Sequence, residues 1–364
     1  MVKLIRGDKG IYAALVILLL LSFIGVLTTY PKTVGVGKVM LEHLVFVVLG
    51  LIIIIGFEHI NYQSKNFKVF MLVACAFSLL SIILLYTPLG VGAAKAVRTL
   101  RLGPVSIQPV EFAKAFMLIY LCFVCNDKIK EINSSWKDFI LYILLPVGVV
   151  GAICLERQGL SSTLIMMAAV FLLLLITPIK KQYIWAILGA GILFILIYAL
   201  FFGGRTATWL QRIRSLFNFE LLVNDPANAI GRGGLFGTFF GDGKVKEFLM
   251  NIESDFVFSA FVEEGGILLG TFIIFVYVAL MLRIAKVVLS TNDLFGKYLV
   301  FSLGILIMLQ AAVHILVCIG IAPETGQQLP FVSKGGSSLL SMCLAAGIIQ
   351  SVAVRNLPSN NKLS

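Results

Sequence analysis

The chain has 364 residues, of which 59% are hydrophobic and only 13% are charged. Soluble globular proteins are about half apolar and a quarter charged, so this composition excludes an ordinary soluble domain and indicates an integral membrane protein. The formal charge of +11 does not point to nucleic acid, because the basic residues lie between apolar stretches. There they meet lipid headgroups or pyrophosphates, or they set the orientation of the chain in the membrane.

Ten apolar stretches are each long enough, at roughly 17–25 residues, to cross a bilayer as a helix. Long apolar runs favour helices over a barrel, and the first run lacks a cleavage site, so it is a retained span rather than a signal peptide. We therefore expect an all-α polytopic membrane protein with ten transmembrane helices. The expected spans are Ile11–Thr29, His43–Glu58, Phe67–Tyr86, Pro109–Asn126, Phe139–Leu155, Leu160–Thr177, Ile184–Phe202, Phe256–Leu282, Leu299–Ile321 and Gly335–Val354.

One connection is long and runs from residue 203 to residue 254, between the seventh and eighth expected spans. It is too apolar for a disordered segment, so we expect short amphipathic helices on the outer membrane face. Short basic segments on the side of the chain ends predict cytoplasmic termini. Residues 1–364 then form one transmembrane domain. The basic residues of the long loop and of Gly90–Gln108 lie outside, where they either contact anionic lipid headgroups or bind an anionic substrate.

The stretch SDFVFSAFVEEGGILLG, Ser254–Gly270, begins with an acid at the mouth of an apolar span. Carboxylates at membrane depth are costly, which makes Asp255 a candidate functional residue. The alternative is that Asp255 only caps the N-terminus of a helix, where aspartate is favoured. Glu263 and Glu264 follow two helical turns later, and we expect them to affect stability more than chemistry.

The stretch IQPVEFAKAF opens the fourth expected span. Glu111 and Lys114 are three residues apart and share a helix face, so they form either a structural ion pair or a polar wall for an anionic substrate. Arg98 and Arg101 lie just upstream and would strengthen such a wall, because guanidinium groups match phosphate oxygens.

The connection PETGQQLPFVSKGGSSLL, from residue 323 to 340, joins the last two expected spans. Backbone this irregular at membrane depth either lines a cavity or is buried in protein. Its polar side chains, among them Ser333 and Lys334, are candidates for substrate binding. A plain re-entrant turn is the alternative.

Five segments of the chain resemble the FtsW/RodA/SpoVE family, also called the SEDS proteins. The resemblance covers nearly the whole chain, and the last two segments are highly specific. The segments are GDKGIYAALVILLLLS (Gly7–Ser22), RLGPVSIQPVEFAK (Arg101–Lys114), AIGRGGLFG (Ala229–Gly237), SDFVFSAFVEEGG (Ser254–Gly266) and TGQQLPFVSKGGSSLL (Thr325–Leu340).

The resemblance implies a peptidoglycan glycosyltransferase that polymerises lipid II, for cell division or cell-shape growth, at the outer face of the bacterial cytoplasmic membrane. It implies Asp255 as the catalytic base, whose pKa desolvation should raise toward a useful range. Arg98, Arg101, Lys114 and Arg212 would neutralise the pyrophosphate, with a divalent cation, Mg²⁺ or Mn²⁺, as an optional helper and no organic cofactor. Glu247 would tune the charge around the base. The implied protein partners are a class B penicillin-binding transpeptidase and other division or elongation proteins.

Some positions depart from the family pattern, namely Thr99 for the usual Trp, Glu253 for the usual His and Lys334 for the usual Tyr. These departures bear on substrate contacts more than on the fold. Two other functions stay open at this stage, a flippase that moves lipid II across the bilayer and an inert scaffold of a division complex. Scarce charges within the spans favour surface chemistry over translocation.

Overall fold

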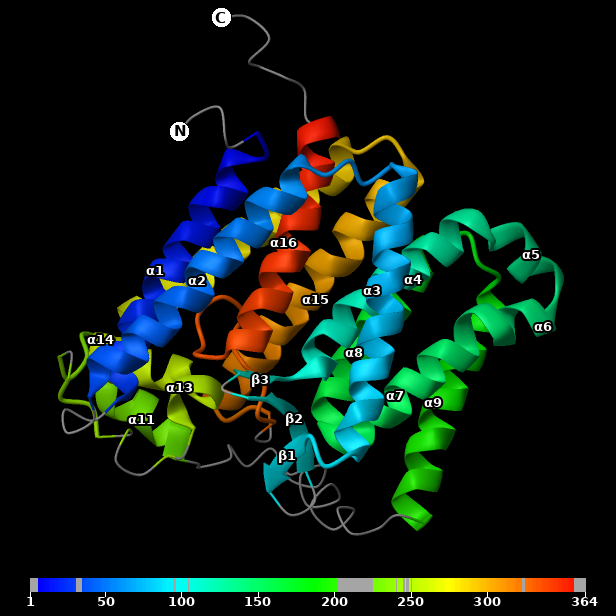
Figure 1. The fold of residues 1–364 in the computed structure, drawn as a ribbon. Coiled ribbons are helices and arrows are strands. Elements are labelled where there is room, and N and C mark those ends of the chain that lie inside the picture. Colours follow the sequence, from blue (N-terminus) through cyan, green and yellow to red (C-terminus); the bar gives the residue numbers. More distant parts are fainter. Residues whose placement is uncertain are drawn as a thin grey trace, which may run out of the picture.

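The computed structural model describes residues 6–30, 35–93, 96–103, 105–201, 225–239, 241–244, 246, 249, 251–322 and 325–356. It is a bundle of helices that run roughly side by side, with both chain ends at one end of the bundle (Figure 1). The principal helices are α1 (Lys9–Thr29), α2 (Val36–His59), α3 (Lys65–Ile83), α4 (Pro109–Asp127), α7 (Leu145–Arg157), α8 (Leu160–Ile176), α9 (Lys181–Phe201), α14 (Val257–Ser290), α15 (Leu294–Cys318) and α16 (Gly336–Asn356).

Shorter elements complete the described chain. A 3₁₀ turn, η1 (Leu84–Tyr86), extends α3. The helices α5 (Ile129–Ser134) and α6 (Trp136–Phe139) and the π-helical turn η2 (Ile140–Leu144) lead into α7. Two further helices, α11 (Asp225–Gly233) and α13 (Ile252–Asp255), precede α14.

Every expected span is helical, and the all-α membrane fold class is confirmed. In the described part of the chain, eight helices are long and apolar enough to cross a membrane. The remaining two expected spans correspond to α8 and α9, whose apolar stretches in the described residues, Leu160–Ile176 and Lys181–Ile197, are shorter. The count of ten membrane crossings therefore stays a prediction.

The last helix, α16, lies at the centre of the bundle, and 89% of an 18-residue apolar stretch of this helix is buried. It packs most extensively against α2. Gly347 permits this contact, because a Cβ at that position would lie 3.1 Å from the Cα of Ile54. Small residues at such crossings let helices approach closely, which is the usual basis of packing in a membrane.

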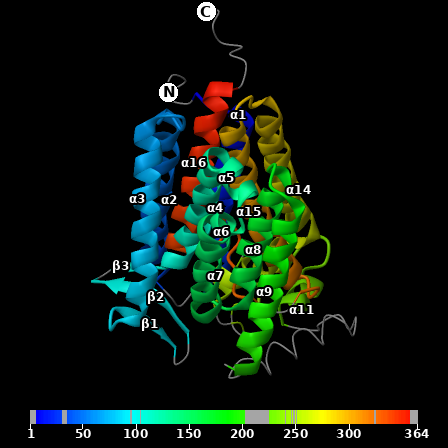
Figure 2. The ribbon, with the colours of Figure 1, turned by 90° about the vertical axis from the view of Figure 1, so that its right-hand side faces the viewer.

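A small sheet occupies the connection between α3 and α4, where the sequence analysis expected no strand. The strands β1 (Gly90–Ala93), β2 (Ala96–Leu102) and β3 (Val105–Ile107) are antiparallel in the order β1-β2-β3. Gly103, with φ 64°, supplies the left-handed turn between β2 and β3. Figures 1 and 2 place this sheet at the end of the bundle opposite the chain ends, together with α11 and α13. We call this end the distal end.

Candidate functional site

Asp255 is the last residue of the one-turn helix α13 at the distal end. Asn251 begins that turn from a left-handed conformation, with φ 58°. Phe256 then departs from helical geometry and occupies the N-cap position of α14. Asp255 therefore does not hold the N-cap position, and the interpretation of this residue as a simple helix cap has no geometric support.

The backbone around Asp255 is fixed by the connection that precedes α16. Ser333 Oγ donates a hydrogen bond of 2.6 Å to the carbonyl of Ser254, and the backbone N–H of Lys334 donates one of 2.9 Å to the carbonyl of Glu253. Ser254 Oγ in turn donates to Asp255 Oδ1 at 2.8 Å. Two adjacent residues of one loop thus hold the turn that carries the candidate base.

Arg98 reaches the same place from β2. A Cβ added at Gly326 would lie 3.4 Å from Asp255 Oδ2 and 3.6 Å from Arg98 Nη1. The carboxylate and the guanidinium therefore border one point of the loop. Gly326 has φ 62° there, a conformation that favours glycine. The structure thus brings together two of the predicted site residues, one acidic and one basic.

Arg101 follows Arg98 by three positions on β2. Arg98 is the extra residue of a β-bulge, because Thr99 pairs with Val91 and Val97 pairs with Gly92, so the regular alternation of side chains is interrupted there. Arg101 is paired with Ser106 of β3 and is exposed. That both cations contact one substrate stays a prediction.

Lys334 contacts the end of α1 rather than the carboxylate of Asp255. Its ammonium donates a 2.7 Å hydrogen bond to the hydroxyl of Tyr30, which donates to Glu253 Oε1 at 3.2 Å. Burial raises the pKa of Tyr30, and the nearby Glu253 carboxylate raises it further. The phenol therefore stays protonated at neutral pH and bridges a cation and an anion beside the α13 turn.

Glu111 and Lys114 form a 2.9 Å ion pair inside the bundle, with the Lys114 side chain fully buried. Lys114 also donates to Gln310 Oε1 at 3.2 Å, and Gln158 donates to Glu111 Oε1 at 3.3 Å. Ser341 Oγ donates to the backbone carbonyl of Glu111. This burial favours the structural interpretation of the pair over a wall that faces the substrate.

Ser333 is likewise buried, and its hydroxyl accepts from the N–H of Leu329 while it donates to Ser254. These two bonds tie the loop to the α13 turn, and the predicted contact of Ser333 with substrate stays a prediction. The sequence analysis did not single out His314, which contacts the same loop. Its Nδ1 lies 2.7 Å from the carbonyl of Gln327, next to Gly326. The contact between His314 and this loop could not be predicted from the sequence, because it depends on where α15 ends.

Arg212 was predicted to neutralise the pyrophosphate, and Glu247 was predicted to tune the charge around the base. Both lie outside the described residues. Among the residues that the structure does describe, no three His, Cys, Asp or Glu side chains come together as a metal site.

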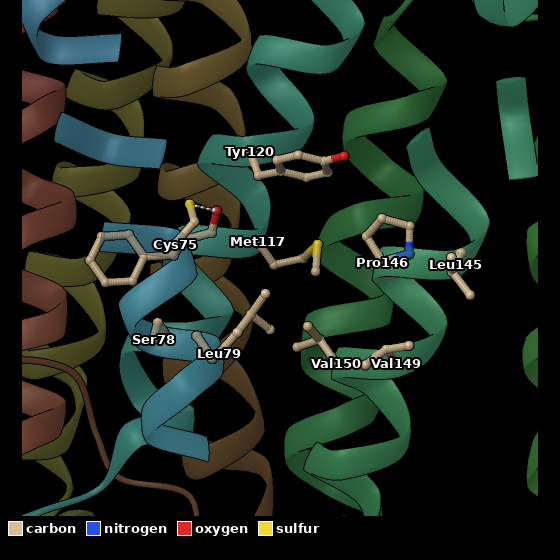
Figure 3. Close-up of a pocket in the computed structure, with 11 residues that line it drawn as sticks. Cys75, Ser78, Leu79, Met117, Tyr120, Leu145, Pro146, Val149 and Val150 are labelled. Atoms are coloured by element: carbon tan, nitrogen blue, oxygen red, sulfur yellow. Dashed lines mark hydrogen bonds between the residues drawn. The ribbon is translucent and has the colours of Figure 1, made fainter. Parts of the chain in front are cut away.

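Two apolar pockets lie along the helices, away from Asp255. The first has a volume of about 320 Å³ between α3, α4 and α7, and its lining includes Cys75, Met117 and Val150 (Figure 3). Among its polar side chains, Cys75 Sγ and the Tyr120 hydroxyl each donate to a backbone carbonyl. The second has about 520 Å³ between α7, α8 and α9. These spaces suit hydrocarbon chains rather than acid–base chemistry.

Comparison with known proteins decides the family. The FtsW/RodA/SpoVE family, described as "Cell cycle protein", matches residues 10–357. The chain belongs to this family. The match includes every segment of the candidate site, so the α13 turn and the loop before α16 lie in the part that the family shares.

Relatives with descriptive names extend over most of the chain. A probable peptidoglycan glycosyltransferase FtsW of Geobacter sp. (strain M18) is 31% identical, over 82% of this chain and 82% of its own. Stage V sporulation protein E of Bacillus subtilis (strain 168) is 27% identical, over 86% of each.

Solved structures share the fold. A chain from a study of the "structural coordination of polymerization and crosslinking by a peptidoglycan synthase complex" has a TM-score of 0.77 at 20% identity, and the match covers 96% of this chain and 98% of that one. The rod shape determining protein RodA of Thermus thermophilus has a TM-score of 0.69 at 21% identity, with 97% and 98% covered.

Proposed function

We propose that this protein polymerises lipid II into the glycan strands of peptidoglycan, for cell division or cell-shape growth. The observation that carries the proposal is the carboxylate of Asp255 beside the guanidinium of Arg98 at the distal end of a membrane bundle. Family membership and the names of the relatives point to the same chemistry.

In the proposed reaction, a sugar hydroxyl of one lipid-linked disaccharide attacks the anomeric carbon of another. A new glycosidic bond forms, the bond from that carbon to the pyrophosphate oxygen breaks, and the polyprenyl pyrophosphate leaves with the electron pair. Asp255 takes the proton of the attacking hydroxyl as general base. Arg98 stabilises the negative charge that develops on the pyrophosphate.

The remaining cations have different places in this proposal. Arg101, which is exposed on β2, is suited to a lipid headgroup or to a more distant part of the substrate. Lys334 serves the site through Tyr30 and Glu253, which border the turn that carries Asp255. Arg212 and Glu247 keep the roles that the family resemblance implies, as leaving-group cation and charge-tuning acid.

A divalent cation remains part of the proposal only as a companion of the substrate. In the described part of the site, Asp255 offers a carboxylate, with the Ser254 hydroxyl next to it. Mg²⁺ is commonly held by one or two carboxylates together with substrate phosphates, so this donor set fits a cation that arrives with the pyrophosphate. Such an ion would supply additional charge stabilisation of the leaving group.

The proposed setting is the bacterial cytoplasmic membrane, with both termini in the cytoplasm and the distal end outside. An outer site suits two amphiphilic substrates whose sugars lie above the membrane and whose chains stay in it. The proposed protein partner is a single-span class B penicillin-binding transpeptidase, with α14 and α15 as the docking helices, alongside other division or elongation proteins.

The test is to incubate the purified protein with lipid II and to measure glycan polymer, alone and with a partner whose transpeptidase site is inactivated. Polymer formation in either case supports the proposal. If the protein with its partner moves lipid II across the vesicle membrane but forms no polymer, the proposal is contradicted and the flippase is favoured.

A further inference from the structure

The long helix α14 is interrupted at Gly266, whose φ of 74° and ψ of 176° are not helical. In a regular helix, the N–H of residue 267 would donate to the carbonyl of residue 263. Here the carbonyl of Glu263 accepts instead from the N–H and the hydroxyl of Thr238, at 3.0 and 3.1 Å. The N–H of Ile267 donates to the carbonyl of Gly234 at 2.9 Å. The loop from Gly234 to Thr238 thus provides hydrogen-bond partners for backbone groups of α14 that lack their usual helical partners.

The backbone at Gly233 and Gly237 lies so close to α14 that neither position has room for a side chain. A Cβ at Gly233 would lie 2.0 Å from the carbonyl oxygen of Val262, and one at Gly237 would lie 2.1 Å from that of Glu264. Because these neighbours are backbone atoms, they cannot move aside as a flexible side chain would. The loop therefore lies directly on the backbone of α14.

Two carboxylates add charge to this contact. Glu264 is fully buried, and it accepts from the backbone N–H groups of Gly241 at 2.8 Å and Gly243 at 3.3 Å. The ammonium of Lys246 donates to Glu264 Oε1 at 2.9 Å and to the carbonyl of Gly241 at 2.8 Å. Glu263 is also buried, and Arg232 of α11 donates to it at 2.8 Å. Buried carboxylates that are paired in this way fix the geometry of the groups around them.

We propose that Glu263 and Glu264 are positioning residues that hold the segment Arg232–Lys246 against α14 and thereby fix where the chain enters the α13 turn. We call this set of contacts the clasp. Lys246 lies only nine positions before Asp255, so the clasp determines where the chain starts its path to the base. The two ends of that path are then both anchored, by Glu264 at the start and by Ser333 at the α13 turn. The inference rests on the proposed function, since it assigns the clasp to the same reaction.

The test combines amide hydrogen exchange with steady-state polymerisation, on the full-length protein with its transpeptidase partner. In Lys246→Met, the peptide that covers residues 234–246 should exchange about tenfold faster, as expected when a buried charge-assisted bond is lost. The turnover number should fall by about 10–100-fold with KM unchanged, because a misplaced base slows the chemical step rather than binding. Lys246→Arg keeps the cation and should retain both properties.

Lys244→Met is the matched control, since it removes the same charge two positions earlier from an exposed side chain. It should leave both exchange and turnover unchanged. If Lys246→Met folds poorly because Glu264 is left buried and unpaired, the double variant Lys246→Met with Glu264→Gln removes both charges and takes its place.

Faster exchange with unchanged turnover would show that the clasp is structural only, and it would overturn the proposal. Slower turnover with unchanged exchange, or a change in KM alone, would assign Lys246 and Glu264 to substrate contact and would overturn it as well. Exchange is measured without substrate, so the clasp itself is tested separately from the reaction. A wild-type protein that makes no polymer would instead contradict the proposed function.

Discussion

Asp255 and Arg98 come from segments more than 150 residues apart in the chain, yet their charged groups border the same glycine. A methyl group at Gly326 would be in van der Waals contact with both. The glycine also has a left-handed conformation, which costs an L-residue with a side chain about 1–2 kcal/mol. The position thus combines a backbone requirement with close proximity to the side chains of Asp255 and Arg98.

Gly326→Ala should therefore lower the free energy of unfolding by about 1–2 kcal/mol. It should also slow polymerisation by at least about tenfold, because the added methyl contacts both the proposed base and the proposed cation. Gly189→Ala is the control, since a Cβ there meets nothing within 4 Å. Unaltered polymerisation by Gly326→Ala would show that the gap beside this glycine is not used in the reaction.

Ser254→Ala removes the hydroxyl that donates to Asp255 Oδ1 and leaves the backbone carbonyl held by Ser333 in place. A donor to a carboxylate favours its charged form, so its loss makes the base easier to protonate. The acidic limb of the pH–rate profile should move to higher pH, with the rate at high pH nearly preserved. A profile that keeps its shape would separate Ser254 from the protonation of the base.

Ser333→Ala should act on structure instead. It leaves the buried N–H of Leu329 without its acceptor, which costs about 1–3 kcal/mol. The unfolding temperature and the polymerisation rate should both fall, while the acidic limb of the pH–rate profile stays at the same pH. A shift of that limb in Ser333→Ala would show that this hydroxyl also acts on the charge of Asp255.

The buried pair of Glu111 and Lys114 should be strongly non-additive. Lys114→Met alone leaves a carboxylate buried without its cation and should cost about 3–5 kcal/mol of stability. The double variant Glu111→Gln with Lys114→Met should cost less than that single variant, measured by thermal or denaturant unfolding. Additive losses would indicate separate roles for the two residues, as in substrate binding.

Tyr30 offers a test of the bridge between Lys334 and Glu253. Its pKa is raised above the ordinary value of 10.0, mainly by burial. Its contribution to stability is therefore complete below about pH 10 and is lost as the pH rises through the folded-state pKa. Above pH 10 the wild-type protein should lose stability faster than Tyr30→Phe, which has no hydroxyl to ionise. Parallel curves of unfolding temperature against pH would contradict this placement of the phenol.

The helices could be predicted from the sequence because spans in a bilayer must satisfy their backbone internally and must be apolar over a fixed length. Pro109 at the start of α4 and the apolar run after Phe256 both gave correct helix starts to within a few residues. The strand β2 was missed, because it lies within a connection that mixes glycine with charge.

The candidate site was predictable as a set of segments but not as a geometry. The importance of Asp255 and of the loop that carries Ser333 could be inferred from acids and irregular backbone at membrane depth. The bond between Ser333 and Ser254 joins positions 79 residues apart, and the bond between Lys334 and Tyr30 joins positions 304 apart. No local pattern encodes such pairs. The clasp of Glu264 on Lys246 depends on the helix break at Gly266, and helical periodicity gave no sign of that break.

The most direct measurement of the central claim is the rate at which purified Asp255→Asn polymerises lipid II, compared with the wild-type protein. Asparagine keeps the size of the side chain and removes the proton acceptor, so the rate should fall by roughly 10²–10⁴-fold. Glu253→Gln, the same chemical change two residues earlier, is the matched control and should cost far less. If Asp255→Asn polymerises at the wild-type rate, Asp255 is not the base and the account of the site is wrong.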